Sequence, residues 1–265
     1  MKTAFKILPQ LQQGDAFHLL IEVGWDVLSF VYFTKDPLCI EALDIYYAPA
    51  TSSAQSLVVD LEKHLNNANL PNRLSTHIFY AFREQTLLPS LFAKEANSGE
   101  VLDALFGANY NTVVHNEQVN KLGLVVTQRV DKQIESLLLK YFPEATIQPS
   151  LACHLQKWDA GTNALMCTVY AHSFQVLLFK NGQIQLARSF MYNTPTDVAY
   201  HLLNVCTQHD FSPEQEQLIL SGFIDHKSNL YDELYRYFLN ISFHTADAAV
   251  ASSQAVSQYP AHFFS

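Results

Sequence analysis

Three apolar, β-branched runs separated by short turns occur twice along the chain, and this repeat predicts the architecture. The first copy comprises His18–Val23, Val27–Thr34 and Leu38–Tyr46. The second copy comprises Ala164–Ala171, Phe174–Lys180 and Gln183–Met191. Each copy leads into a run with the apolar spacing of an amphipathic helix. Two three-strand meanders, each closed by a helix, predict a duplicated, two-lobed α/β fold.

Between the two copies, runs with helical spacing and strand-like runs alternate. Leu57, Leu61 and Leu65 recur at helical spacing, with Ser52 or Ser53 as the cap and Pro71 just past the end. The other elements expected here are a β pair at His77–Phe82 and Thr86–Phe92, a helix capped by Ser98, strands at Tyr110–His115, Leu122–Arg129 and Thr146–Gln148, a helix that begins at Asp131 and one that Ser150 caps. They predict that a small α/β insert, at about residues 75–118, interrupts the first lobe.

The second copy continues into a helix with a clear start signal. Thr194-Pro195-Thr196-Asp197 supplies a capping hydroxyl, a proline at the first helical position and an acid in the first turn. A strand at Gln217–Ser221, a helix at Leu230–Phe238 and a strand at Ile241–His244 are expected to follow. The chain should therefore form two lobes, 1–160 and 161–245, each with a mixed five-stranded sheet. The tail, 246–265, ends in Phe263 and Phe264, which are expected to dock on the body.

Composition and charge narrow the classes of function. With 265 residues, 49% of them hydrophobic and 15% charged, the chain can form two globular domains. A formal charge of −9 argues against a nucleic-acid surface, which needs clustered Lys and Arg. No apolar run is long enough to span a bilayer and the N-terminus has no secretory pattern, so a cytoplasmic protein with four free, widely spaced cysteines is expected.

Two β-β-β-α-β-α repeats, the first interrupted by an insert, resemble the actin-like ATPase fold that is shared with Hsp70 and sugar kinases. Within that superfamily the chain looks most like the bacterial type IV pilus assembly protein PilM and the cytoplasmic part of the secretion protein GspL. His77–Phe92 and the Ser98 helix resemble the extra subdomain of PilM, and Leu122–Trp158 resembles the elements that return to its first lobe. The resemblance covers about residues 17–244 and implies a duplicated, ribonuclease H-like pair of lobes.

In active members of this superfamily, the first hairpin turn carries Asp-x-Gly, whose carboxylate orders the water shell of a metal and whose glycine admits phosphate. The corresponding segment here is Glu22-Val23-Gly24, followed by Trp25 and Asp26. A carboxylate and a glycine are kept, but bulky Trp25 stands where a small residue would admit phosphate. Glu22, Gly24 and Asp26 are therefore only candidate remnants of a nucleotide cleft.

The second lobe departs further from the pattern of the superfamily. By sequence register, its phosphate turn is Tyr170-Ala171-His172, which has neither the Asp nor the Gly. The adenosine loop corresponds to Ser221-Gly222-Phe223, with a phenylalanine where base and ribose would lie. His172, Ser221 and Gly222 complete the candidate cofactor-binding residues. Only 8 of the 265 residues are glycine, about 3% against a usual content of about 7%. Phosphate cradles depend on glycine.

These departures predict a non-catalytic cytoplasmic interaction or scaffold protein, a degenerate member of the actin-like ATPase superfamily. Two alternatives stay open: a nucleotide-binding regulatory ATPase whose phosphate contacts have moved, and a PilM-like assembly factor that binds a peptide of a membrane partner. No cofactor is expected under the first hypothesis, whereas ATP and Mg²⁺ belong to the second. The 11 histidines are scattered and predict no metal site. Protein partners are expected, nucleic acid is not, and a homodimer stays open.

Overall fold

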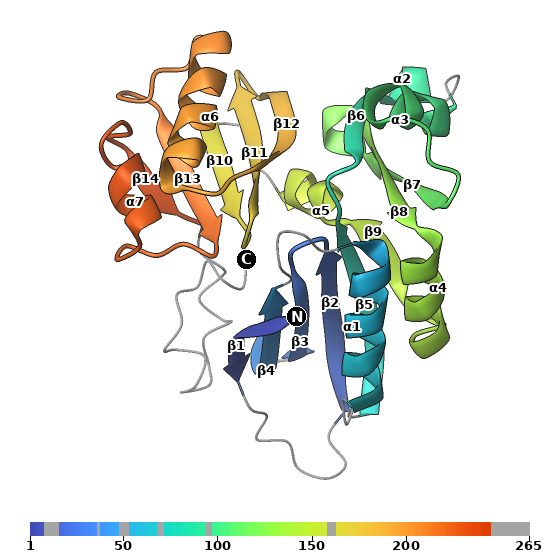
Figure 1. The fold of residues 1–265 in the computed structure, drawn as a ribbon. Coiled ribbons are helices and arrows are strands. Elements are labelled where there is room, and N and C mark those ends of the chain that lie inside the picture. Colours follow the sequence, from blue (N-terminus) through green and yellow to red (C-terminus); the bar gives the residue numbers. More distant parts are fainter. Residues whose placement is uncertain are drawn as a thin grey trace. The chain divides into compact units, whose positions relative to one another are not determined.

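The chain divides into two compact units, Met1–Trp158 and Asp159–Ser265, in a computed structural model that describes residues 1–7, 16–35, 38–47, 53–67, 72–93, 97–157 and 163–244. Each unit is an α/β lobe built on a mixed sheet (Figure 1). Both sheets begin with the predicted antiparallel meander and continue with parallel strands. The predicted duplication of a meander followed by a helix is confirmed.

The first lobe has a six-stranded sheet in the order β1-β4-β3-β2-β5-β9. Its strands are β1 (Lys2–Ile7), β2 (Ala16–Gly24), β3 (Leu28–Lys35), β4 (Leu38–Tyr47), β5 (Asn72–Ala81) and β9 (Thr146–Pro149). Five strands were expected, and the sixth is β1, which pairs with β4 at the edge of the sheet. An edge strand is held by its neighbour, so a short N-terminal run gives little local signal for it.

Outside the insert, the described residues of the first lobe form three helices: α1 (Ala54–Asn67), α4 (Lys132–Tyr141) and α5 (Ser150–Lys157). Ser53 and Asp131 accept hydrogen bonds from backbone N–H groups at the starts of α1 and α4, as predicted. The Ser150 hydroxyl, expected to cap α5, is instead buried and forms no hydrogen bond. The core joins the sheet to one face each of α1 and α4 and includes Leu19, Ile21, Phe30, Leu57, Leu61, Ile78, Ile134 and Leu138.

A separate three-stranded antiparallel sheet, β6-β8-β7, forms the insert of the first lobe. The elements of the insert are β6 (Gln85–Pro89), α2 (Ser90–Ala93), α3 (Ser98–Phe106), β7 (Thr112–Val119), the 3-10 turn η1 (Asn120–Leu122) and β8 (Leu124–Asp131). The predicted pairing of His77–Phe82 with Thr86–Phe92 is wrong, because β5 lies between β2 and β9 while β6 pairs with β8. The insert therefore spans Gln85–Asp131 rather than about 75–118. Asn97, not Ser98, caps α3.

The second lobe has a five-stranded sheet, as predicted, in the order β12-β11-β10-β13-β14. Its elements are β10 (Ala164–Val169), β11 (Ser173–Lys180), β12 (Gln183–Met191), α6 (Pro195–Gln208), β13 (Gln217–Gly222), α7 (Asn229–Leu234) and β14 (Ile241–Phe243). Thr194 and Asp197 form a capping box at the start of α6, as the sequence predicted. The helix expected at Leu230–Phe238 is shorter and ends at Leu234. The tail, 246–265, lies outside the described residues.

Within the part of the chain that the structure describes, no helix is both long enough and apolar enough to cross a membrane.

Candidate functional site

The first candidate turn is a tight hairpin that packs against the neighbouring strand. The N–H of Gly24 donates to the carbonyl of Val27 at 2.9 Å and closes the hairpin between β2 and β3. A Cβ atom on Gly24 would lie 2.7 Å from the carbonyl oxygen of Ala81 on β5. The ring of Trp25 packs edge-on against Phe82, with ring centroids 5.2 Å apart. The close approach of β5 is therefore a sufficient reason for the glycine.

The two acids of this hairpin lie in different surroundings. Glu22 sits within β2, opposite Ser29 and Phe79 in the sheet register. Burial raises the pKa of the Cys153 thiol in α5. The Lys157 ammonium lowers this pKa, and the negative charge of Glu22 raises it. Asp26 is buried, with only 7% of its surface exposed. Glu22, Gly24 and Asp26 thus lie on one hairpin of the first lobe.

The structure corrects the predicted position of the second phosphate turn by two residues. The N–H of Tyr170 donates to the carbonyl of Ser173 at 2.8 Å, the same closing bond that Gly24 forms with Val27. Tyr170 is therefore the counterpart of Gly24, and Thr168 is the counterpart of Glu22. The Thr168 hydroxyl forms a 2.9 Å hydrogen bond with that of Ser221, its partner in the register of β10 and β13. The second turn is Thr168-Val169-Tyr170, which still has neither Asp nor Gly.

Gly222 meets a stricter steric limit than Gly24. Its φ of +79° is rare for residues with a side chain, and an added Cβ would lie 2.1 Å from the carbonyl oxygen of Val169. That same carbonyl accepts a hydrogen bond from the N–H of Phe223 at 2.8 Å. His172 lies in the turn between β10 and β11, where its own carbonyl accepts from the N–H of Tyr192 at 3.1 Å. His172, Ser221 and Gly222 thus belong to neighbouring strand ends of the second lobe.

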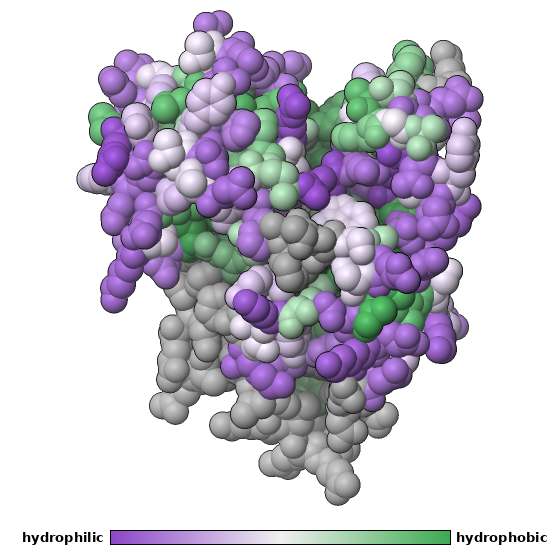
Figure 2. Space-filling view, in the orientation of Figure 1, coloured by the Kyte–Doolittle hydropathy of each residue, from purple (hydrophilic) through white to green (hydrophobic). Residues whose placement is uncertain are grey.

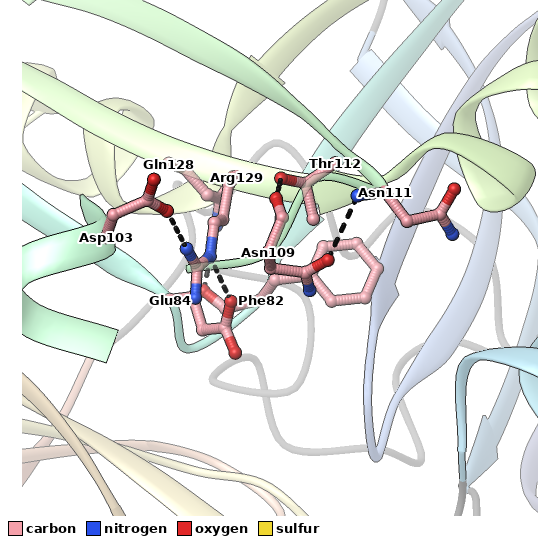
Figure 3. A network of polar contacts seen from close by, with 8 residues as sticks. All are labelled: Phe82, Glu84, Asp103, Asn109, Asn111, Thr112, Gln128 and Arg129. Atoms are coloured by element: carbon pink, nitrogen blue, oxygen red, sulfur yellow. Dashed lines mark hydrogen bonds and ion pairs between the residues drawn. The ribbon is translucent and has the colours of Figure 1, made fainter. Parts of the chain in front are cut away.

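A polar network in the insert was not foreseen from the sequence (Figure 3). Arg129 is buried on β8, where its guanidinium forms ion pairs with Glu84 and, at 2.9 Å, with Asp103 of α3. The side-chain amide of Gln128 donates to the carbonyls of Tyr80 and Phe82, at 3.1 and 2.8 Å, and so ties the insert to β5. The only sequence signal was Gln-Arg inside the apolar run of β8, because buried polar side chains need partners.

Two histidines that the sequence placed in separate elements are joined across the sheet of the first lobe. The Ser75 hydroxyl lies 2.7 Å from Nδ1 of His18 and 3.2 Å from Nε2 of His77, and Nδ1 of His77 lies 2.7 Å from the Thr146 hydroxyl. Among the described residues, no group of three or more His, Cys, Asp or Glu side chains could hold a metal ion. The chain thus contains a polar ladder of two histidines and two hydroxyls, too few strong ligands for a typical metal site.

We expect the free energy of unfolding to decrease as the pH falls below about 6.5. Burial lowers the pKa of His18 and of His77, and the Lys35 ammonium lowers both further; burial also lowers the pKa of His64. The unfolded chain then binds protons more readily than the folded one. The contribution of the neutral histidines to stability is therefore complete above pH 6.5 and is lost as the pH falls toward the folded pKa values. Urea unfolding at pH 7.5 and 5.5 measures the difference.

The matched comparison for this pH effect is the double substitution His18→Gln with His77→Gln. It should flatten the dependence of the urea midpoint on pH. Equal pH dependence in the wild type and the double variant would contradict the assignment.

Solved structures with the same fold define the class of this protein. The chain is similar to a Bacteroides thetaiotaomicron protein with an actin-like ATPase fold and unknown function, at 20% identity and a TM-score of 0.73, over 86% of this chain and 90% of that one. It is also similar to the PilM-PilN type IV pilus biogenesis complex, at 14% identity and a TM-score of 0.61, over 93% and 95% of the two chains. The fold is therefore the actin-like ATPase fold, and the predicted resemblance to proteins with this fold, PilM among them, is confirmed.

Residues 10–241 match the family described as "Protein of unknown function (DUF3822)", and the chain belongs to that family. No curated protein matches the sequence significantly.

Proposed function

We propose that this chain is a non-catalytic, cytoplasmic interaction protein that uses the actin-like ATPase fold as a scaffold. The observation that carries the proposal is the hydrogen-bonded pair of Thr168 and Ser221 at the second turn. Thr168 stands where the superfamily places a carboxylate, and its hydroxyl is bonded to Ser221. Glu22 would have to hold a hydrated metal ion from one lobe only. On these grounds we propose that the chain has no catalytic residues.

The backbone around both turns supports the same proposal. A phosphate cradle needs backbone N–H groups that point at the ligand. The N–H groups of Gly24, Tyr170 and Phe223 donate instead to the carbonyls of Val27, Ser173 and Val169. Gly24 and Gly222 are used for close approach between strands. Their retention therefore does not require a nucleotide, although Glu22, Asp26, His172 and Ser221 are the residues at which a relocated contact would be sought.

A second candidate function is an assembly factor that captures a peptide of a membrane partner. Exposed apolar side chains on α3 of the insert and in the loop that follows it favour it, because soluble proteins rarely leave such groups together without use. The similar PilM structure is a complex with PilN. This candidate is a more specific form of the interaction protein, and both forms predict a protein partner and no ATP hydrolysis.

We expect no ATP hydrolysis and no Mg²⁺–ATP affinity tighter than about millimolar, a binding free energy near −4 kcal/mol. Thermal unfolding and calorimetric titration with ATP, ADP and Mg²⁺ measure this directly. At a concentration of about 5 mM, a ligand with a Kd of about 1 mM stabilises the native state by about 1 kcal/mol. At the same concentration, a ligand with a Kd of about 1 μM would stabilise it by about 5 kcal/mol. The two cases are therefore well separated.

The variants for this test must leave the glycines unchanged. Valine at position 24 or 222 would collide with Ala81 or Val169 and would disturb the fold with or without a nucleotide. Glu22→Gln is the informative change, and Glu117→Gln on β7 of the insert is its control. Micromolar binding that Glu22→Gln weakens and Glu117→Gln does not would overturn the non-catalytic proposal in favour of the regulatory ATPase.

A further inference from the structure

Large apolar side chains are exposed at the end of α3 and in the loop that follows it. They are Leu105 and Phe106 on α3 and Tyr110 in the loop; we call them the insert patch. Leu91 and Phe92 are exposed on α2, which follows the end of β6 that pairs with Leu124, whereas the Tyr110 loop leads into the end of β7 that pairs with Asp131. In the insert patch, the exposed fractions range from 42% for Phe106 to 87% for Tyr110. Figure 2 shows apolar residues gathered over this part of the first lobe. Grouping of this kind, unlike a single exposed leucine, is typical of an interaction site.

The two helices do not need these side chains for their own packing. Every residue of α2 is at least partly exposed, and Leu102 is the buried residue of α3. Both helices rest on β8 through other contacts, among them the ion pair between Asp103 and Arg129. Leu105 and Phe106 therefore contribute apolar surface without contributing to the core of the insert.

The loop that carries the exposed side chain of Tyr110 is ordered by hydrogen bonds, of which Figure 3 draws those that join Asn109 to Asn111 and Thr112. The Thr112 hydroxyl donates to the carbonyl of Asn109 at 2.9 Å, and the N–H of Asn111 donates to the side chain of Asn109 at 3.1 Å. The Lys132 ammonium holds the carbonyl of Tyr110 itself at 2.8 Å. A preformed backbone reduces the entropy cost of binding, and aromatic side chains on such supports often dominate interface energies.

The charge beside Phe106 in the insert patch is negative, whereas the Lys132 ammonium lies at the backbone of Tyr110. The guanidinium of Arg129 is buried 5.9 Å from the centre of the Phe106 ring, while the side chains of Glu84 and Asp103 are 36% and 40% exposed. Two carboxylates against one guanidinium leave one net negative charge beside Phe106. Glu100, exposed on the same helix, adds a second. An incoming group with Lys or Arg next to its apolar residues would neutralise this net negative charge.

We propose that the insert patch binds a short segment of a partner protein in which Leu- or Phe-type anchors stand beside Lys or Arg. This inference rests on the proposed function, since it names the surface that an interaction protein of this kind uses. A second copy of the chain is disfavoured as the occupant because the acidic rim would face its own like charges. The formal charge of −9 on each copy opposes that association as well.

The test is selection of a random dodecapeptide library on the full chain, followed by synthesis of the enriched peptides and titration by fluorescence anisotropy. Enriched sequences should combine apolar residues with Lys or Arg. Leu105→Ser with Phe106→Ser should weaken their binding by tenfold or more, because both side chains are exposed and the fold should survive. The matched control is Leu239→Ser, a leucine of the second lobe that is 64% exposed, against 57% for Leu105.

Charge is tested by Glu100→Lys, which should weaken binding several-fold and reduce its dependence on salt. A library that enriches nothing, acidic consensus sequences, or peptides that bind the double serine variant as well as the wild type overturn the inference. A dimer in sedimentation velocity that the double serine variant abolishes would also overturn it, with a second copy as the occupant. Failure of the non-catalytic proposal is a separate result, namely micromolar Mg²⁺–ATP binding.

Discussion

Gly222→Ala is expected to lower the free energy of unfolding of the second lobe by about 3 kcal/mol or more. The added Cβ would lie 2.1 Å from the carbonyl oxygen of Val169, and alanine would have to adopt a φ of +79°. Relief of the collision requires β10 and β13 to separate, and these strands are neighbours in the centre of the sheet. Urea unfolding measures the loss, and hydrogen exchange of the β10 and β13 amides locates it in this lobe.

Gly107→Ala separates the two causes. Gly107 has a φ of +85°, but a Cβ there would meet nothing within 4 Å. Its cost is therefore the backbone strain alone, about 1–3 kcal/mol, because a ψ of 155° with this φ is essentially restricted to glycine. Equal losses for Gly107→Ala and Gly222→Ala would show that the close approach to Val169 is not the reason for the second glycine. In that case a ligand would again be the better explanation for Gly222.

Arg129→Met is expected to cost about 2–4 kcal/mol, the second large effect. Methionine matches much of the arginine stem but leaves Glu84 and Asp103 without the cation that both contact. The two carboxylates then repel each other beside the buried residues of β8. Part of the cost is relieved because both side chains reach solvent, so the loss should lie below that of a fully buried ion pair. Urea unfolding of the full chain measures it.

The carboxylates provide the control for Arg129→Met. Adding Glu84→Gln and Asp103→Asn to Arg129→Met should restore much of the lost stability, since no unpaired charge then remains. A triple variant as unstable as Arg129→Met alone would mean that the guanidinium acts through packing against Phe106 rather than through the charges. Loss of peptide binding without loss of stability would instead place Arg129 in the insert patch itself.

The elements predicted correctly from the sequence are those held by contacts between near neighbours. Both meanders follow from alternating apolar residues and turns of a few residues. The capping box of Thr194 and Asp197 is complete within four positions. Asp131 likewise caps α4 through the N–H of Gln133. Such signals are local, so they survive in one sequence without knowledge of the fold.

The caps expected at Ser98 and Ser150 and the end of α7 are local errors, and the larger errors concern pairings between distant segments. The run at His77–Phe82 is followed at once by another strand, and this favours a hairpin, yet β5 joins β2 and β9 while β6 joins β8. Several apolar strands compete for each edge, and only the complete sheet decides among them. The second turn was misplaced by two residues for a related reason: the closing hydrogen bond from Tyr170 to Ser173 fixes its register, and the residue pattern alone does not.

By itself, the sequence determined the duplicated α/β architecture and the absence of an Asp-x-Gly turn in the second lobe, because both depend on which residues occur within a short run. Only the tertiary structure decided that Gly24 and Gly222 face backbone atoms of neighbouring strands and that Arg129 is buried between Glu84 and Asp103. It also decided which apolar side chains of α2 and α3 are exposed. The same residue types can serve a ligand, a core or a partner. Which of these they serve depends on what the folded chain places within a few ångströms of them.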